Sequence, residues 1–208
     1  MDATDSIDDP GFCRFGYVMQ LIVAAINPRG TSGARVAAVL FEFQPYTTAR
    51  YLFHLDDQCN STVSVNIPRV VFEYYGVKHR GLKREDLTYP NVRATTTKPY
   101  SALKLAANGM RSTGRPTSTI ILTDGKSHQS VSSQIEILKT LSDPLIAAGI
   151  GPDTNVPFLL KLASNSSTVV YEPDKDQVLN LGKRIINTMK ATGALCDDEG
   201  IYCMIIIS

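Results

Sequence analysis

The chain has 208 residues, a formal net charge of +1 and 43% hydrophobic residues. This length favours a single domain, and the apolar fraction is enough for a sizeable core, which excludes a globally disordered chain. The near-neutral charge excludes a wholesale attraction to nucleic acid or to an anionic membrane. No apolar run approaches the roughly 20 residues of a spanning helix, and the chain does not begin with the basic and apolar segments of a secretory signal.

The first half of the chain predicts a helix followed by a hairpin. Apolar residues recur at helical spacing over residues 12–27, and Asn-Pro-Arg-Gly ends the run. Residues 34–43 and 49–55 have the composition of strands, and the sequence QPYTT between them is suited to a hairpin turn. The long mixed segment over residues 60–95 fits neither pattern, so we expect an insertion there.

From about residue 100 onward, the sequence alternates between helix and strand patterns. The predicted helices span 100–111, 132–141, 156–164 and 174–192, and the predicted strands span 118–125, 144–151 and 167–173. The strand at 118–125 is almost continuously apolar, which is typical of a strand covered on both faces of a parallel sheet. The alternation predicts an α/β fold with a doubly wound, mainly parallel sheet flanked by helices, as in Rossmann-like folds.

The last residues do not follow this alternation. They include Ile205-Ile206-Ile207, a run without an amphipathic pattern. This run is either a strand that pairs elsewhere or a tail that is not native to the domain. We therefore expect the domain to span residues 1–192, with 193–208 as a tail whose membership of the domain the sequence leaves open.

Oxygen-bearing side chains stand at three places in the sequence. Asp2, Thr4 and Ser6 are spaced two apart, so they point the same way if the backbone is extended. The threonine run of RATTTKPY stands just before a predicted helix, and Asp124 ends a predicted strand, where ligands of such sheets bind. Converging hard oxygen donors suit a divalent cation such as Mg²⁺. For the first cluster alone, a disordered acidic terminus is the alternative.

This ordered set resembles the metal-ion-dependent adhesion site of the von Willebrand factor A domains, which include the inserted domains of integrins. That site reads D-x-S-x-S, then a Thr, then an Asp in an apolar strand. The resemblance implies direct binding of Mg²⁺ or Mn²⁺ by Thr4, Ser6 and Thr97. It implies that Asp2 and Asp124 complete the shell, directly or through water, and that one position stays open for a partner's carboxylate. This is adhesion chemistry, so no enzyme activity is expected.

The sequence departs from the family pattern in three respects. Thr4 replaces the usual first Ser, and Pro99-Tyr100 replaces the usual Thr-Gly. The family's first strand, which should end at Asp2, is absent, and its loss from the centre of the sheet would leave two neighbouring strands unpaired. We expect Met1 to be an internal methionine at which the chain was cut, or the start of an incomplete gene model. Either origin would also explain the missing secretory leader.

Cysteines and sequons favour an extracellular, secreted glycoprotein. The chain has no C-x-x-C pair, and its even number of widely spaced cysteines permits two disulfides without selecting the pairing. The cysteines are Cys13, Cys59, Cys196 and Cys203. Two N-x-[ST] sequons make Asn60 and Asn165 candidate glycosylation sites.

A concentrated basic run over residues 77–84 lies in the expected insertion. It contains Lys78, Arg80, Lys83 and Arg84. Closely spaced cations raise the local potential, so this run is a candidate site for an acidic polysaccharide. The alternative is an ordinary solvated loop.

These patterns favour a divalent-cation-dependent adhesion domain that recognises an acidic group on an extracellular matrix or cell-surface protein. The alternative is a metal-independent structural interaction module of a matrix assembly. A phosphate-handling hydrolase is the third interpretation, since Gly125-Lys126-Ser127 ends like a phosphate-binding loop. Ile120 stands where that loop needs its first glycine, and Thr4 stands where an aspartate-based phosphohydrolase needs its second Asp.

Overall fold

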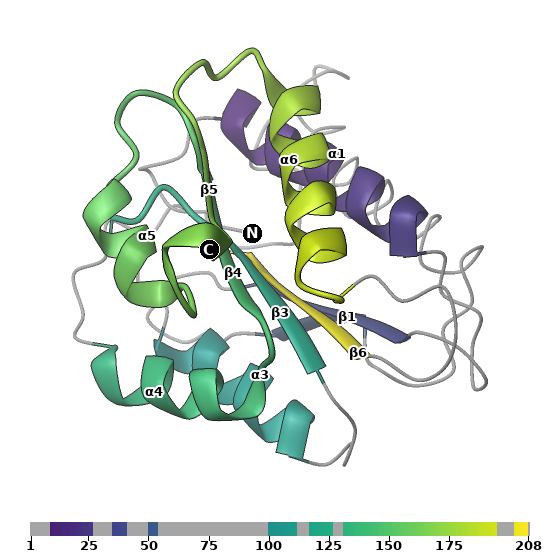
Figure 1. Cartoon of the computed structure of the whole chain (residues 1–208), viewed down its shortest axis with the longest axis vertical. Helices are drawn as coiled ribbons and strands as arrows, with labels where there is room; N and C mark the ends of the chain where they lie inside the picture. Colours follow the sequence, from purple (N-terminus) through teal and green to yellow (C-terminus); the bar gives the residue numbers. More distant parts are fainter. Residues whose placement is uncertain are drawn as a thin grey trace, which may run out of the picture.

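The structure is a computed structural model that describes most of the sheet and its helices. The described residues are 9–26, 35–40, 50–53, 100–111, 117–126, 131–194 and 202–207. They form one six-stranded sheet with helices on both faces (Figure 1). The predicted α/β class with a doubly wound, mainly parallel sheet is confirmed.

The sheet has the strand order β2-β1-β6-β3-β4-β5. The strands are β1 (Arg35–Leu40), β2 (Arg50–Phe53), β3 (Thr117–Leu122), β4 (Leu145–Ile150), β5 (Val169–Glu172) and β6 (Tyr202–Ile207). The β1–β2 pair is antiparallel, as the predicted hairpin requires, and all other neighbours are parallel. The carboxyl ends of the five parallel strands therefore lie along one edge of the sheet.

Two groups of helices cover the sheet. The helices are α1 (Asp9–Ile26), α3 (Tyr100–Arg111), α4 (Ser132–Leu141), α5 (Val156–Leu162), α6 (Val178–Ala191) and the short 3-10 helix η3 (Ser166–Thr168). The helices α1 and α6 lie side by side on one face, and α3 packs beside α4 (Figure 1). The last helix begins four residues later than predicted. A turn precedes it, in which the amides of Asp176 and Gln177 donate to the side chain and the carbonyl of Asp174.

The central strands are buried from both sides, which explains why their sequences are almost continuously apolar. Ile121 belongs to the core formed with α3, α4 and α5. Its neighbour Ile120 is fully buried and points to the opposite face, because successive side chains of a strand alternate. On that face α1 and α6 approach closely at Gly182, where a Cβ atom would lie 2.7 Å from Cδ1 of Leu21.

The centre of the sheet is occupied by β6, which lies within the expected tail at residues 193–208. Its residues pair in parallel register with Arg35–Leu40 on one side and with Thr117–Leu122 on the other. This is the place where the family's first strand is expected and where the sequence predicts a gap. Strands of a parallel sheet that carries helices on both faces need not alternate between apolar and polar residues, so the Ile205–Ile207 run is compatible with this place. The predicted domain boundary at residue 192 stays a prediction.

Candidate metal centre

Asp124 stands at the carboxyl edge of the sheet, two residues after the end of β3. Its backbone is held from the β4 side by two hydrogen bonds. The amide of Thr123 donates to the Ala148 carbonyl (3.0 Å), and the amide of Asn155 donates to the Asp124 carbonyl (2.8 Å). Asp124 is only 7% exposed. The carboxylate is therefore fixed in place by strand pairing rather than carried on a free loop.

The turn after Asp124 is specified by its own side chains. The Gly125 amide donates to Oγ1 of Thr123 (2.9 Å), and the Lys126 amide donates to Oδ1 of Asp124 (2.9 Å). Such side-chain-to-backbone bonds are the reason that Thr and Asp favour tight turns. Gly125 has a φ of +75°, and a Cβ atom there would lie 2.9 Å from the Asn155 carbonyl oxygen. Only glycine satisfies both the backbone angle and the close approach.

The second carboxylate oxygen of Asp124 lacks a hydrogen bond. Oδ2 is buried and finds no hydrogen-bond partner within the described chain. The nearest cation is Nζ of Lys126 at 3.7 Å, on a side chain that is 44% exposed. Ion pairs with so exposed a partner contribute little, whereas a buried oxygen without a donor is costly. The oxygen is thus available to a hard divalent cation, whose preferred ligands are of this kind.

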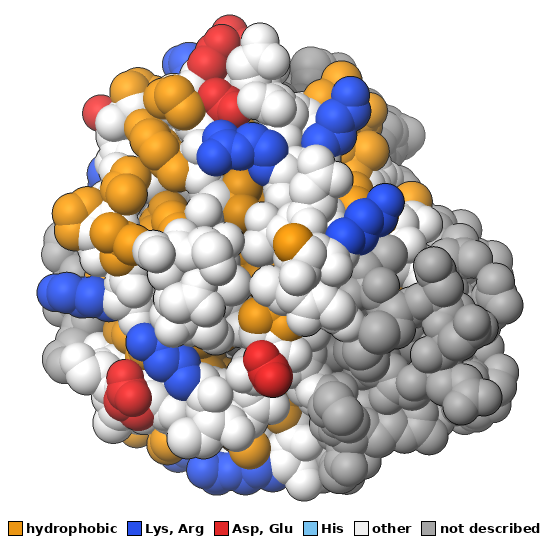
Figure 2. Space-filling model, viewed as in Figure 1, with side chains coloured by type: hydrophobic (Ala, Val, Ile, Leu, Met, Phe, Trp, Pro, Cys, Tyr) orange, Lys and Arg blue, Asp and Glu red, His pale blue; other side chains and the backbone are white. Residues whose placement is uncertain are grey.

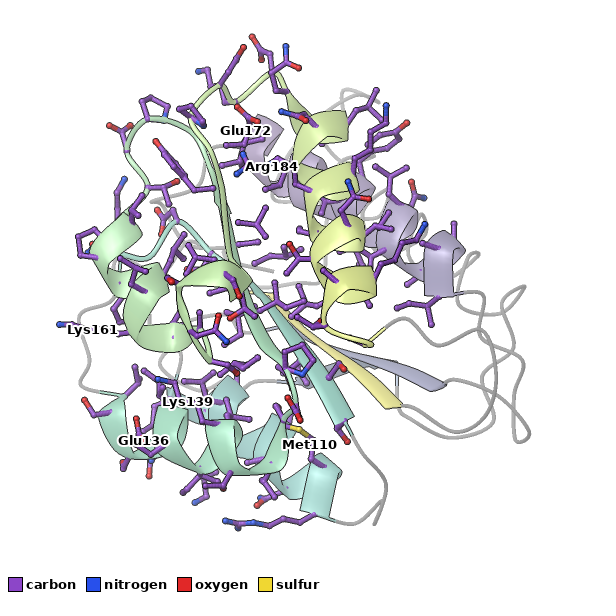
Figure 3. The ribbon with its side chains drawn as sticks, in the orientation of Figure 1. Met110, Glu136, Lys139, Lys161, Glu172 and Arg184 are labelled. Atoms are coloured by element: carbon purple, nitrogen blue, oxygen red, sulfur yellow. The ribbon has the colours of Figure 1, made fainter. Side chains whose placement is uncertain are left out.

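A second buried carboxylate at the same edge, that of Glu172, has the hydrogen-bond donor that Oδ2 of Asp124 lacks among the described residues. Glu172 ends β5, and its Oε2 accepts a hydrogen bond from Nδ2 of Asn180 (2.5 Å). Oε2 also lies 3.6 Å from Nη1 of Arg184, which donates to the Tyr171 carbonyl (2.6 Å). Figure 3 shows Glu172 and Arg184 close together between β5 and α6. Described residues satisfy Glu172 and thereby join α6 to β5, whereas none of them donates a hydrogen bond to Oδ2 of Asp124.

The edge around Asp124 is shared with two other elements. Leu122 and Ile207 are register partners, so β3 and β6 end side by side. The loop after β4 supplies Asn155 and also Thr154, whose buried Oγ1 has no hydrogen-bond partner in the described residues.

A sequence model of the von Willebrand factor type A domain matches residues 1–184. The chain belongs to this family. The chain is 29% identical over 100 residues to the human collagen alpha-5(VI) chain, a match that covers 47% of this chain and 4% of the collagen chain.

Solved structures of proximal thread matrix protein 1 from the mussel byssus share the fold of this type A domain. The form with a zinc-occupied MIDAS motif, the metal-ion-dependent adhesion site, has a TM-score of 0.67 at 21% identity. A second crystal form has a TM-score of 0.65 at 20% identity. Both matches cover 92% of this chain but only 44% of the mussel chain, so the chain spans less than half of that protein.

Of the metal ligands predicted for the type A domain, the structure describes only Asp124. It lies where the sequence predicts it, at the end of a buried strand. Apart from Asn165, the remaining predicted site residues lie outside the described residues: Asp2, Thr4, Ser6, Thr97, Asn60, Lys78, Arg80, Lys83 and Arg84. Sequence reasoning did not single out Lys126 as the neighbour of the carboxylate. The order Asp124-Gly125-Lys126 is visible in the sequence, but the ion pair between Lys126 and Asp124 depends on the geometry of the turn at Gly125.

Two kinds of feature are absent from the described part of the type A domain. No group of three or more His, Cys, Asp or Glu side chains is placed to hold a metal ion there. The predicted ligand set is mostly hydroxyl, so this absence does not bear on it. Among the described helices, none is long and apolar enough to cross a membrane. Figure 2 shows the described Lys and Arg side chains dispersed over one face rather than gathered in a patch.

The sequon at Asn165 lies on the surface of the type A domain. Asn165 is exposed, and its Oδ1 accepts hydrogen bonds from the amide (2.9 Å) and the hydroxyl (2.6 Å) of Ser167. The Asn165 amide in turn donates to Oγ1 of Thr168 (3.2 Å), which completes a capping box for η3. Only the carbonyl oxygen of the Asn165 side chain takes part in this cap. Its Nδ2, the atom that glycosylation would modify, is not needed for it.

Proposed function

We propose that this type A domain is a divalent-cation-dependent adhesion module. It binds Mg²⁺ or Mn²⁺ and recognises an acidic group on an extracellular matrix or cell-surface protein. The observation that carries the proposal is the buried Oδ2 of Asp124, which has no hydrogen-bond partner among the described residues. The mussel neighbour with a zinc-occupied site supports metal binding by this fold. The names of both relatives, a collagen chain and a thread matrix protein, support an extracellular setting.

The proposed ligands divide between one rigid position and several outside the described residues. Asp124 contributes from the end of β3, where strand pairing and the Gly125 turn fix its backbone before any metal arrives. The hydroxyls of Thr4, Ser6 and Thr97, with the carboxylate of Asp2, are the proposed remaining donors. A bound cation with mostly neutral direct ligands would stay electrophilic and accept an external carboxylate. This chemistry is association and requires no bond to be broken.

Lys126 has a defined part in this proposal. Its ammonium group lies 3.7 Å from Oδ2 of Asp124, and it is the nearest described cation to the proposed site. A divalent cation at Oδ2 would repel it, and the exposed side chain is free to turn into solvent. Lys126 therefore neutralises the carboxylate in the metal-free domain and competes weakly with the metal.

Isothermal titration calorimetry with Mg²⁺ and Mn²⁺ tests the metal site directly. Asp124→Asn keeps the size of the side chain and removes its charge, so we expect metal affinity to fall at least tenfold. Asp153→Asn is the matched control, because Asp153 is an exposed carboxylate in the loop after β4 at the same edge. Equal loss in both variants, or loss in neither, contradicts a metal site at Asp124.

A second experiment tests the partner. Immobilised matrix proteins are offered to the domain with and without EDTA, and again after carbodiimide amidation of their carboxyl groups. The proposal expects binding that both treatments abolish. Binding that survives EDTA and the Asp124→Asn substitution would instead indicate the metal-independent structural module.

A further inference from the structure

The strand at the centre of the sheet comes from a distant part of the chain. Tyr202, the first residue of β6, pairs with Thr117 of β3 and Arg35 of β1, which stand 85 and 167 positions earlier. The ten residues 192–201 connect β6 to the end of α6. In the described residues, β6 is reached from β5 through α6, which packs on β4 and β5, so this crossover passes over two strands, whereas β4 and β5 each follow an immediate neighbour in the sheet. The central strand is therefore inserted between two strands, neither of which precedes it directly in the chain.

The sequence of β6 suits a strand that must be paired. It reads Tyr-Cys-Met-Ile-Ile-Ile, with no charge, no proline and no glycine. A short uncharged segment of high β-propensity is prone to join any available strand edge when it is not covered. If β6 leaves the sheet, β1 and β3 each lose a ladder over their full length. Their backbone groups along the gap then need another strand to pair with.

The contacts that hold β6 are the same whichever copy of the chain supplies it. Its neighbours are β1 and β3, with α3 alongside, and all three lie before residue 123 in the sequence. An identical strand from another copy would form the same two parallel ladders. The equilibrium between β6 paired within its own chain and β6 paired in another copy then depends on the connecting segment 192–201 and on protein concentration. This is the condition for exchange of an identical element between protomers.

We propose that β6 is an exchangeable strand whose partner is a second copy of this chain. Residues 202–207 of one copy fill the gap between β1 and β3 of another, and the assembly is linear when each copy gives to one neighbour and receives from a second. A head-to-tail contact of this kind produces an open chain unless its rotation closes a ring. This assembly needs neither the metal nor the acidic ligand of the proposed function.

A disulfide across the β3–β6 register distinguishes the two forms. Ser118 and Cys203 are register partners. Neighbouring strands lie about 4.8 Å apart, within the Cα separation that a disulfide accepts. The test chain carries Ser118→Cys, with Cys13, Cys59 and Cys196 replaced by Ser. Chains labelled with ¹⁴N and ¹⁵N are mixed in denaturant, refolded, oxidised and digested, and the peptide that links positions 118 and 203 is analysed by mass.

The proposal expects linked peptides that join a ¹⁴N strand to a ¹⁵N strand, in a fraction that rises with concentration during refolding. A short tether gives an effective concentration of about 1 mM, so exchange in roughly one tenth of the chains is expected at about 0.1 mM. Lys104→Cys, an exposed position on α3, replaces Ser118→Cys in the control and measures random oxidation between chains. The mixed-isotope product must exceed this control.

Two results overturn the proposal. One is a 118–203 disulfide that forms efficiently but joins only like isotopes at about 0.5 mM, because β6 then stays in its own sheet. The other is the absence of this disulfide both within and between chains, because β6 then lies beside β3 neither in its own chain nor in a second copy. If Ser118→Cys prevents folding, native mass spectrometry of the unaltered, isotope-mixed chain decides. Mixed-isotope dimers after concentrated refolding support exchange, and monomers alone refute it.

Discussion

Gly149 in β4 is a position at which a single added methyl group should disturb the sheet edge that carries the candidate metal centre. A Cβ atom there would lie 2.5 Å from Cγ2 of Thr154, 2.8 Å from the Thr123 carbonyl oxygen and 3.1 Å from Cδ1 of Leu159. The two side chains can shift, but the carbonyl belongs to the residue before Asp124 and is held by strand pairing. Overpacking of this kind costs about 1–3 kcal/mol, and we expect Gly149→Ala to lie at the upper end, near 3 kcal/mol.

Gly193→Ala separates this steric effect from the general cost of replacing glycine. Gly193 has a φ of +71°, and a Cβ atom added there would meet no heavy atom within 4 Å, so only the left-handed backbone is penalised, by about 1 kcal/mol. Urea unfolding measures both variants. With an m-value of about 3 kcal/mol/M, the midpoint should fall by about 1 M for Gly149→Ala and about 0.3 M for Gly193→Ala. Equal shifts would refute the steric argument, as would a Gly149→Ala chain of unchanged stability.

Three further predictions concern side chains near the surface or the metal edge. Thr154→Val removes a buried hydroxyl that has no described partner, so the free energy of unfolding should stay unchanged or rise by up to about 1 kcal/mol, and a clear loss in a denaturant titration would contradict this. Lys126→Met removes the cation that competes at Asp124, so calorimetry should show Mg²⁺ affinity raised by up to about fivefold, whereas weaker binding would mean that Lys126 assists the metal. Expression through a secretory pathway should add a glycan at Asn165, seen as a mass shift of the peptide that contains Asn165, which Ser167→Ala abolishes and Ser167→Thr retains.

Much of the fold after residue 100 could be predicted because local pattern and tertiary role agree there. The helices at 100–111 and 132–141 match the structure to the residue, since their apolar faces and their ends are both marked in the sequence. The predicted start of the last helix, residue 174, is wrong by four residues, since α6 begins at Val178. The side chain of Asp174 accepts a hydrogen bond from the Asp176 amide and so stabilises a turn. Local hydrogen bonds of this kind compete with helix formation.

The place of β6 could not be predicted, and its strand character was one of two alternatives, the other being a tail that is not native to the domain. Ile205-Ile206-Ile207 indicates a buried strand, but the backbone bonds of a ladder are the same for every sequence and identify no partner. For the metal centre, the position of Asp124 followed from an Asp-Gly pair after an apolar run. The unpaired Oδ2 and the approach of Lys126 depend on the geometry of a single turn, which sequence spacing does not give.

The central position of β6 also determines when the sheet can be completed. Within the described strands, β1 with β2 and β3 with β4 and β5 form two separate groups, and only β6 hydrogen-bonds to both. A ribosome makes residues 202–207 after all five of the other strands, so the two groups must wait, with facing edges uncovered, until the bridging strand emerges. Pairings over such long sequence separations slow folding, because the entropy of loop closure is lost before any stabilising contact forms. The chain should therefore fold late and cooperatively rather than progressively during synthesis.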